Sequence, residues 1–338
     1  MMFAAALEEN KFDMFKDTYY DKGYEIVNGS RISSWKKGGH GLQTFLQVLE
    51  NSSNPGFVEI ARRLGKEKIY EYVKNYGFLE KTGIDIAGEN KGIFFSYDKF
   101  NEVEQATTCF GQGISVTSIQ LVSAFSSLIN GGYLYKPYIV KSIGNPLIDE
   151  DLQIFEKQIV RKVLSKETSD KMRYALESVV SKGTGRKAYV TGYRVGGKTG
   201  TSQIAENGIY VDGKYILSFI AGAPMNDPQL VVYFQIKNAK NTVQYGGTTV
   251  GPIVGRIIND SLKEMKIPLQ EDGIERTYTW MDLKTYKVEN YIGLEKNKVK
   301  SQYFTFVFKG NGNKVIDQLP KVGTLLEQNS TIMLYLGD

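Results

Sequence analysis

The sequence predicts an α+β fold in which helices flank an antiparallel sheet, followed by a small second domain. Apolar residues recur at three-to-four-residue spacing through much of the chain before residue 181, as in amphipathic helices. Three β-rich runs then follow closely, at Arg194–Ile204, Tyr215–Ala223 and Leu230–Lys237. Because an Asn226-Asp227-Pro228 turn separates the last two runs, we expect them to pair antiparallel. Helical blocks with a late antiparallel sheet predict a sheet covered by helices on both faces.

Start and stop signals bound several of the expected helices. Ser115 or Thr117 can accept a backbone hydrogen bond as the N-cap of a helix over Thr117–Ile129. Gly183 ends the next helix, Lys166–Val180, and a last helix over Val250–Met265 precedes Pro268. Tyr19 to Trp35 reads as a hairpin-like stretch. The remaining expected helices are Met1–Glu9, Leu42–Glu50, Gly56–Leu64 and Glu67–Tyr76.

The chain divides into two predicted domains, 1–266 and 285–338, joined by a linker at 267–284. A chain of 338 residues can hold one large and one small domain. The linker includes Leu269–Thr279, which is polar and contains a turn-forming Asp272-Gly273 pair. The second domain has short β-runs at Phe304–Lys309, Val315–Leu319 and Thr331–Leu336, separated by glycine and proline turns.

Composition is that of an ordinary globular protein. Hydrophobic residues make up 41% and charged residues 23% of the chain, which are ordinary shares for such a protein. The net charge of +5 includes no run of five or more basic residues, so nucleic acid is not an expected partner. Cys109 stands alone and His40 is the sole histidine, so we expect neither a disulfide nor a metal site, and no cofactor. No apolar stretch reaches the roughly 18 residues of a membrane span.

The most informative segment is Gly196-Gly197-Lys198-Thr199-Gly200-Thr201, in the first of the three β-rich runs. A strand offers backbone groups to which an extended peptide can add as a further strand. Gly200 lets such a peptide approach closely, and Thr199 and Thr201 fall on one face by alternation. Lys198 supplies the positive charge that a carboxylate or an oxyanion needs. Lys-Thr-Gly on a strand is an element of serine acyl-transfer sites.

Two other interpretations of this segment remain open on these residues alone. It can be a glycine-rich turn that enters a core strand. Gly192 to Thr199 also fits the pattern of the phosphate-binding loop, G-x-x-x-x-G-K-[ST]. That loop requires a helix to follow, whereas β-rich runs follow here, so we disfavour it.

A second polar motif, Asn51-Ser52-Ser53-Asn54-Pro55, precedes the expected helix Gly56–Leu64. The Ser52 hydroxyl can both donate and accept a hydrogen bond, and Asn54 carries two donors and an acceptor. Both groups suit a proton-relay site. The alternative is a polar turn that only starts the helix.

A nucleophilic serine is not evident. In S-x-x-K sites the serine attacks and the lysine one helical turn later takes its proton. Three matches occur, at Ser33, Ser34 and Ser96, but none begins an expected helix, so we attribute all three to chance. His40 would be needed for a Ser-His-Asp triad and is expected in a loop instead.

Taken together, these motifs resemble the transpeptidase domain of class B penicillin-binding proteins, from the first residues to about 265. The resemblance is greatest to a sporulation branch, with cell-division enzymes as near neighbours. The motifs that carry it are Asn51-Ser52-Ser53-Asn54-Pro55, Thr82-Gly83-Ile84-Asp85, Gly111-Gln112-Gly113-Ile114-Ser115, Gly131-Gly132-Tyr133, Gly183-Thr184-Gly185 and Lys198-Thr199-Gly200.

The resemblance implies a penicillin-binding, β-lactamase-like fold and roles for specific residues. Ser52 would relay a proton, Asn54 would bind the substrate amide, and Lys198 would complete the catalytic set. Thr199, Gly200 and Thr201 would bind the substrate, with the Thr201 N–H as half of an oxyanion hole. Implied partners are peptidoglycan stem peptides, β-lactams and a membrane glycosyltransferase, at the outer face of the cell membrane.

The family's S-x-x-K would fall just upstream of Met1, because Ala4-Ala5-Ala6-Leu7-Glu8-Glu9-Asn10 matches the stretch that follows it. We therefore expect that an N-terminal part is missing and that this chain alone does not acylate. The alternative is a non-catalytic remnant or scaffold protein. The second domain is similar to a PASTA domain, but Glu295–Tyr303, at the position of its helix, is short and lysine-rich.

Overall fold

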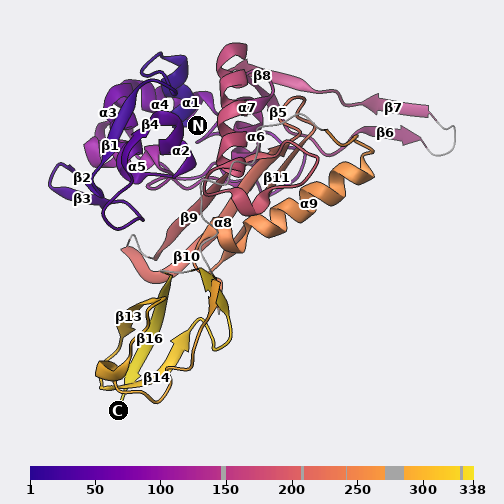
Figure 1. The fold of residues 1–338 in the computed structure, drawn as a ribbon. Helices are drawn as coiled ribbons and strands as arrows, with labels where there is room; N and C mark the ends of the chain where they lie inside the picture. The colour runs from indigo at the N-terminus through magenta and orange to yellow at the C-terminus, as the bar shows by residue number, and fades with distance from the viewer. Residues whose placement is uncertain (146–149, 207–208, 241, 271–284, 328–329) are drawn as a thin grey trace.

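The computed structural model describes residues 1–145, 150–206, 209–240, 242–270, 285–327 and 330–338. Its main sheet has the order β11-β10-β9 and is antiparallel throughout (Figure 1). The strands are β9 (Gly196–Glu206), β10 (Ile209–Ala223) and β11 (Leu230–Lys237). All three predicted strands are confirmed, but β9 lies two residues later than predicted and β10 begins at Ile209 rather than Tyr215. Among the described strands, β9 pairs with β10 alone, so its other edge is free of strand pairing.

Helices cover both faces of this sheet, as predicted. Leu217, Phe219 and Ala221 of β10 share a buried cluster with one face of α9 (Gly251–Glu264). Ile220 points the other way, into a larger cluster that contains α6 (Ser118–Ile129) and α7 (Lys166–Ser181). This alternation along β10 is the period of a strand buried on both sides. The N-cap of α6 is Thr117, one of the two predicted caps.

The larger cluster extends into the N-terminal helices, which carry the turn that contains Ser52. Nearly all of α1 (Met2–Glu8) is buried, and Phe12 stacks on Phe45 with ring centroids 4.2 Å apart. Phe45 begins α2 (Phe45–Glu50), and α3 (Asn54–Leu64) and α4 (Lys66–Asn75) follow. The predicted helices at 56–64 and 67–76 are therefore confirmed, each with an earlier start.

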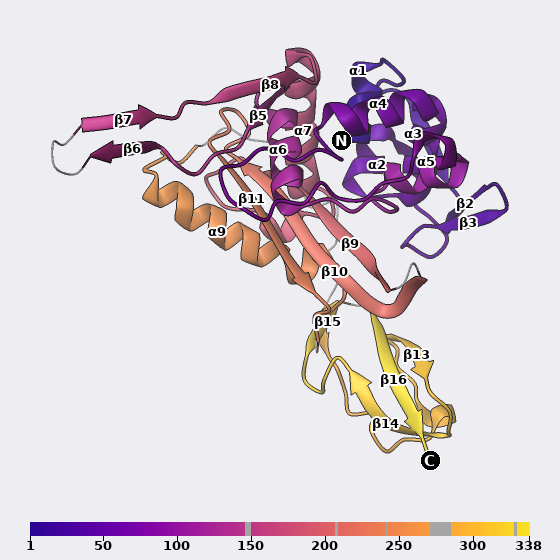
Figure 2. The ribbon, with the colours of Figure 1, turned by 180° about the vertical axis from the view of Figure 1, so that it is seen from behind.

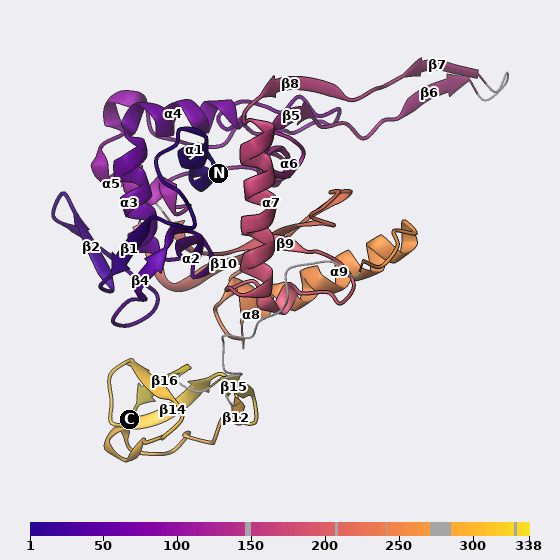
Figure 3. The same cartoon turned by 45° about the horizontal axis from the view of Figure 1, so that its top comes forward.

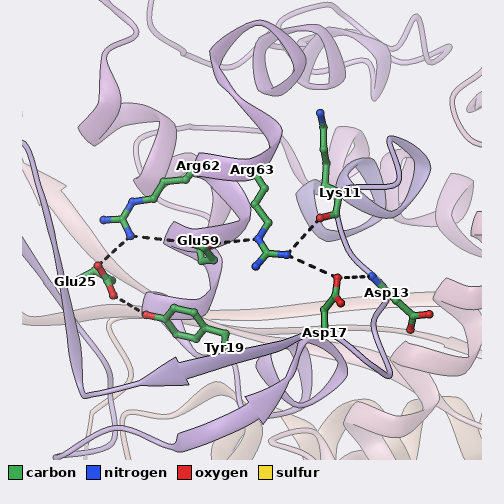
Figure 4. Close-up of polar contacts among 8 residues, drawn as sticks. All are labelled: Lys11, Asp13, Asp17, Tyr19, Glu25, Glu59, Arg62 and Arg63. Carbon is green, nitrogen blue, oxygen red and sulfur yellow. Dashed lines mark hydrogen bonds and ion pairs between the residues drawn. The ribbon is translucent and has the colours of Figure 1, made fainter.

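Charged side chains on α3 connect it to the first strands (Figure 4). Arg62 Nη1 lies 3.0 Å from Glu25 Oε2, and Glu25 Oε1 accepts a 2.8 Å hydrogen bond from the Tyr19 hydroxyl. Arg63 Nε pairs with Glu59 at 2.9 Å, and its Nη1 lies 3.8 Å from Asp17. Partly exposed ion pairs of this kind contribute little stability each. Arg62 thus pairs α3 with β2, and Arg63 pairs it with Asp17, the residue before β1.

The prediction of a helix from Leu42 is wrong at its start. Residues 41–44 form β4 (Gly41–Thr44), which pairs with β1 (Thr18–Asp21). Thr44 and Gln47 then form a reciprocal capping box, so the helix begins only at Phe45. The expected hairpin is confirmed in part: β2 (Tyr24–Val27) pairs with β3 (Ser30–Ser33), while β1 pairs with β4.

Other elements were not predicted. A short helix, α5, spans Glu102–Cys109. The predicted last helix, Val250–Met265, is confirmed as α9. A one-turn helix that was not predicted, α8 (Gly246–Thr249), precedes it, and η1 (Tyr97–Lys99) and η2 (Arg186–Ala188) are single 3₁₀ turns. A long hairpin arm, paired through β6 (Ser142–Asn145) and β7 (Glu150–Ile154), projects from the body (Figure 2). At its base β5 (Tyr133–Lys136) pairs with β8 (Gln158–Lys162).

The C-terminal tail has a separate buried cluster around Tyr291, Ile332 and Leu334. Its strands form a group of their own, apart from the main sheet (Figure 3). Its sheet has the order β13-β16-β14, and a second pair joins β12 to β15. In place of the helix at Glu295–Tyr303, the structure has a 3₁₀ turn, η3 (Lys296–Lys298). The strands are β12 (Thr285–Lys287), β13 (Thr305–Lys309), β14 (Lys314–Leu319), β15 (Leu325–Glu327) and β16 (Thr331–Gly337).

Most of the predicted linker, residues 271–284, lies outside the described residues, so the domain boundaries remain a prediction. Val243, which lies in the predicted first domain, packs against the tail cluster. Within the described part of the chain, none of the helices combines the length and the apolar character needed to cross a bilayer.

Candidate active site

The turn between α2 and α3 presents Ser52 in an unusual backbone conformation. Its φ is +53°, in the left-handed region that non-glycine residues rarely adopt. The next residue, Ser53, is fully buried and caps α3, because its Oγ accepts a hydrogen bond from the Gly56 N–H at 3.2 Å. The same hydroxyl donates to Asp21 Oδ2 at 2.8 Å. Ser53 therefore holds the turn in place, and the hydroxyl of Ser52 is not needed for this structural role.

Lys198 and Ser52 meet although 146 residues separate them. Lys198 Nζ on β9 donates to Ser52 Oγ at 2.7 Å and to the Thr199 carbonyl at 3.2 Å. Burial lowers the pKa of the Lys198 ammonium from 10.5 to about 8. The pair joins a cation that titrates near neutral pH to a hydroxyl that can pass a proton on. Such a pair suits proton relay and carboxylate binding.

Thr199 and Thr201 both make contacts beyond the strand. The Thr199 hydroxyl lies 3.3 Å from the Thr184 hydroxyl, and either oxygen can be the donor. Thr201 Oγ1 accepts a hydrogen bond from the Gly246 N–H at 3.1 Å, at the start of α8. Because Thr201 uses a lone pair in this bond, its hydroxyl proton is available to a ligand oxygen.

Close packing around Gly200 is a feature that we did not predict. A Cβ at this position would clash with Ser218 Oγ on β10, and the start of α8 lies close to the Gly200 carbonyl. At Gly200 only the Ser218 hydroxyl, which can rotate, lies in the way of a side chain, and the close approach of α8 requires the missing side chain of Gly246. That Gly200 serves the approach of a peptide to the free edge of β9 remains a prediction.

Asn54 lies at the first position of α3 and points to β3. Its Nδ2 donates to the Ser33 carbonyl at 3.2 Å. This bond uses one of its two amide hydrogens. The expectation that Asn54 binds a substrate amide stays a prediction.

Three further residues contact the Ser52 turn or its surroundings, and sequence reasoning had given them no role. Trp35 Nε1 donates to the Asn51 carbonyl at 2.8 Å. Thr184 donates to the Glu50 carbonyl through its N–H at 2.9 Å and through its hydroxyl at 3.1 Å. The Tyr245 ring lies 6.4 Å from the Trp35 ring. Of these three residues, only Thr184 belongs to a motif that the sequence analysis had noted, Gly183-Thr184-Gly185.

The three serines of the S-x-x-K matches do not begin an α-helix. Ser33 ends β3 and Ser34 follows it, while Ser96 precedes the 3₁₀ turn η1. His40 packs edge-on against Trp35 with centroids 5.3 Å apart. Burial, together with the nearby Lys36 charge, lowers the pKa of His40, so its imidazole is neutral near pH 7.

Comparison with known proteins gives a consistent result. The family model of the penicillin binding protein transpeptidase domain matches residues 1–259. Stage V sporulation protein D of Bacillus subtilis is 49% identical over 337 residues, which are 99% of this chain and 52% of that protein. A peptidoglycan D,D-transpeptidase FtsI homolog of Mesostigma viride is 32% identical over 269 residues, which cover 75% of this chain and 43% of that protein. The chain thus spans about half the length of these curated relatives.

Solved structures agree on the fold. The transpeptidase domain of Burkholderia pseudomallei penicillin-binding protein 3 has a TM-score of 0.71 and 28% identity, covering 80% of this chain and 78% of that one. Penicillin binding protein 3 of Mycobacterium tuberculosis, complexed with ampicillin, has a TM-score of 0.72 and 24% identity. The match covers 80% of this chain and 62% of that one, and it supports the fold alone. The matched residues include both Ser52 and Lys198. The chain belongs to the penicillin-binding protein transpeptidase family, of the class B type to which its sequence motifs pointed.

Proposed function

We propose that this chain carries the substrate-binding part of a D,D-transpeptidase site, which cross-links peptidoglycan stem peptides through a serine acyl-enzyme. The observation that carries the proposal is the 2.7 Å contact between Lys198 Nζ and Ser52 Oγ beside the free edge of β9. The printed names of relatives, stage V sporulation protein D and a D,D-transpeptidase FtsI homolog, support the same activity.

In this proposal a D-alanyl peptide lies along β9 as an added strand. Its terminal carboxylate accepts hydrogen bonds from the hydroxyls of Thr199 and Thr201, and the positive charge of Lys198 attracts it. Asn54 binds a peptide amide, and the Thr201 N–H stabilises the oxyanion. β-Lactams bind at the same place because their carboxylate and carbonyl resemble those of the peptide end.

The covalent step needs the serine and lysine of an S-x-x-K pair. The serine oxygen bonds to the carbonyl of the penultimate D-alanine, and the bond to the terminal D-alanine breaks. The departing amine takes up the proton that the serine loses, by way of Ser52 and Lys198. The nitrogen of an acceptor amine then bonds to the same carbonyl carbon, the ester bond to the serine oxygen breaks, and the proton that the amine loses returns to that oxygen. None of the three S-x-x-K matches, all of which lie in the described residues, begins an α-helix, so we propose that the chain alone does not complete this step.

Location and partners follow from the same proposal. We place the working protein at the outer face of the cell membrane, beside a membrane glycosyltransferase that supplies the glycan strand. The name of the Bacillus subtilis relative favours a sporulation role over cell division. The tail, residues 285–338, is proposed to be a PASTA-like module, although η3 replaces its expected helix.

The test uses a matched pair of proteins and fluorescent penicillin. The 338-residue chain should not be labelled covalently. The same chain, preceded by a helical segment that carries the family's S-x-x-K motif, should be labelled. In that chimera Lys198→Ala should slow labelling by roughly tenfold or more, since a charged hydrogen-bond partner contributes about 1.5–3 kcal/mol.

Two outcomes would contradict the proposal. One is a stable labelled band on the 338-residue chain that Ser52→Ala or Ser34→Ala abolishes. The other is a Lys198→Ala chimera that is acylated as fast as its parent. A folded chimera that neither labels nor binds D-alanyl peptides would favour a non-catalytic scaffold protein.

A further inference from the structure

We infer that Trp35 is a positioning residue for Ser52 and acts through the peptide bond between Asn51 and Ser52. The inference rests on the proposed function, because it concerns the same site. Its starting observation is the 2.8 Å hydrogen bond from Trp35 Nε1 to the Asn51 carbonyl.

The carbonyls at the end of α2 explain why this bond matters. The last carbonyls of a helix have no partner within the helix. Here the Val48 and Leu49 carbonyls accept hydrogen bonds from Ser53 N and Ser52 N, at 3.1 and 3.2 Å. The Glu50 carbonyl accepts both the N–H and the hydroxyl of Thr184. The Asn51 carbonyl is the one that a tryptophan side chain satisfies.

The Asn51 carbonyl belongs to the peptide unit that leads directly into Ser52. A peptide unit is planar, so a hydrogen bond to its oxygen restricts the orientation of the whole unit. Ser52 has φ +53°, a conformation that persists only where surrounding contacts hold it. If the carbonyl is released, the turn can relax and carry Ser52 Oγ away from Lys198 Nζ.

The surroundings of Trp35 fit a positioning role better than a core role. The residue is 45% exposed, so burial of apolar surface does not account for its place. Its ring lies 5.3 Å from His40 and 6.4 Å from Tyr245. Tyr245 immediately precedes Gly246, whose N–H donates to Thr201. Trp35 therefore touches both the Ser52 turn and the segment that contacts the Lys-Thr-Gly strand.

A double-mutant cycle on the 338-residue chain tests the inference without any acyl-enzyme. Trp35→Phe removes the N–H donor and keeps an aromatic ring, and Ser52→Ala removes the acceptor for Lys198. The readout is the pH midpoint of Lys198 reactivity, because only the neutral amine reacts with acetic anhydride. Mass spectrometry of the Lys198 peptide gives the midpoint for each variant. Tyr138→Phe, a change at another exposed aromatic residue, is the matched control.

Both single variants should lower the midpoint, because the charged amine loses its hydrogen-bond acceptor. We expect a shift of roughly 0.3–1 pH unit for Trp35→Phe, from a hydrogen bond of ordinary strength. In the Ser52→Ala background, Trp35→Phe should add no further shift. Tyr138→Phe should leave the midpoint unchanged. Circular dichroism checks that each variant is folded.

Two results overturn the inference alone. One is a midpoint that Ser52→Ala moves and Trp35→Phe does not. The other is a Trp35→Phe shift that persists unchanged in the Ser52→Ala background, which would mean that Trp35 acts on Lys198 by another route. If Ser52→Ala itself leaves the midpoint unchanged, the Lys198–Ser52 contact does not exist in solution. That result rejects the site on which the proposed function rests, together with the role of Trp35.

Discussion

The two halves of the candidate site are built in different ways. Lys198 lies on a regular strand whose position is fixed by backbone pairing with β10, residue by residue from Gly196 to Gln203. Ser52 lies in an irregular turn, with φ +53°, that side chains from distant segments hold. Trp35 and Thr184 bind the carbonyls before Ser52, and Asp21 binds the Ser53 hydroxyl after it.

This difference predicts which substitutions each half tolerates. The position of a strand that is held by backbone hydrogen bonds depends little on individual side chains. It depends strongly on the space that is left between the strand and its neighbours. A turn held by side chains depends on each of those side chains and on the helix that leads into it. The predictions below separate the two halves by these sensitivities.

The largest effect is expected in the helix that leads to Ser52. Phe45→Ala should lower the free energy of unfolding by about 3–5 kcal/mol, because Phe45 is fully buried at the start of α2 and stacks on Phe12. Leu42→Ala, three residues earlier but 70% exposed, should change it by less than about 0.5 kcal/mol. Urea unfolding measures both. Equal losses would mean that α2 does not anchor the Ser52 side.

The next effect concerns the charge on the strand side. The Lys198 pKa falls from 10.5 in the unfolded chain to about 8 in the folded protein. Between these values the unfolded chain holds more protons, so this group adds stability as pH rises from 8 to 10.5. The same contribution is lost as pH falls through the folded value.

In Lys198→Met this pH-dependent contribution should be absent. Between pH 8 and pH 10.5, the unfolding free energy of the variant should rise less than that of the parent, by on the order of 3 kcal/mol. Denaturant unfolding at a series of pH values gives the difference. Identical pH dependence in both proteins would contradict a lowered Lys198 pKa.

A smaller effect distinguishes two glycines on β9. A Cβ at Gly197 would lie 2.6 Å from the Ile220 carbonyl and 2.6 Å from the Phe219 ring, neither of which can move easily. Gly197→Ala should therefore cost about 1–3 kcal/mol of stability. At Gly200 the nearest atom is the hydroxyl of Ser218, which can rotate, so Gly200→Ala should cost less. Thermal unfolding compares the two variants. A larger loss of stability for Gly200→Ala would show that the space around β9 does not determine which substitutions this strand tolerates.

The smallest effect is expected from the tail. Deleting residues 285–338 removes a cluster that has its own buried residues and contacts the larger domain through Val243. The pH midpoint of Lys198 reactivity should stay within about 0.2 pH unit of the parent value, well under the shift expected from a lost hydrogen bond. A shift as large as that of Ser52→Ala would show that the tail helps to hold the site.

The regular elements were predictable from residue patterns. Leu230–Lys237 was predicted with its correct bounds, because a run of β-branched and aromatic residues follows a clear turn. The start of α2 was missed because Leu42, Phe45 and Leu46 extend the helical spacing backward into β4. The Thr44–Gln47 capping box was the signal that marks the true start.

Other features lacked a local signal. The helix Glu102–Cys109 has few apolar residues, and the arm carries exposed ones such as Leu152 and Ile154, so hydrophobic periodicity fails for both. The contact between Ser52 and Lys198 joins residues far apart in sequence, and only the family resemblance indicated it. The bond from Trp35 to the Asn51 carbonyl depends on tertiary packing, which no local pattern records.

The central claim is that β9, with Lys198 beside Ser52, receives the carboxylate end of a D-alanyl peptide. The most direct test is a nuclear magnetic resonance titration of the 338-residue chain with a peptide that ends in D-Ala-D-Ala. A peptide that differs only in a C-terminal amide serves as the control. The account predicts that the acid shifts the backbone amide signals of Thr199, Gly200 and Thr201 in a saturable way, and that the amide shifts them far less. Equal shifts from both peptides, or saturable shifts that leave these three residues unchanged, would contradict it.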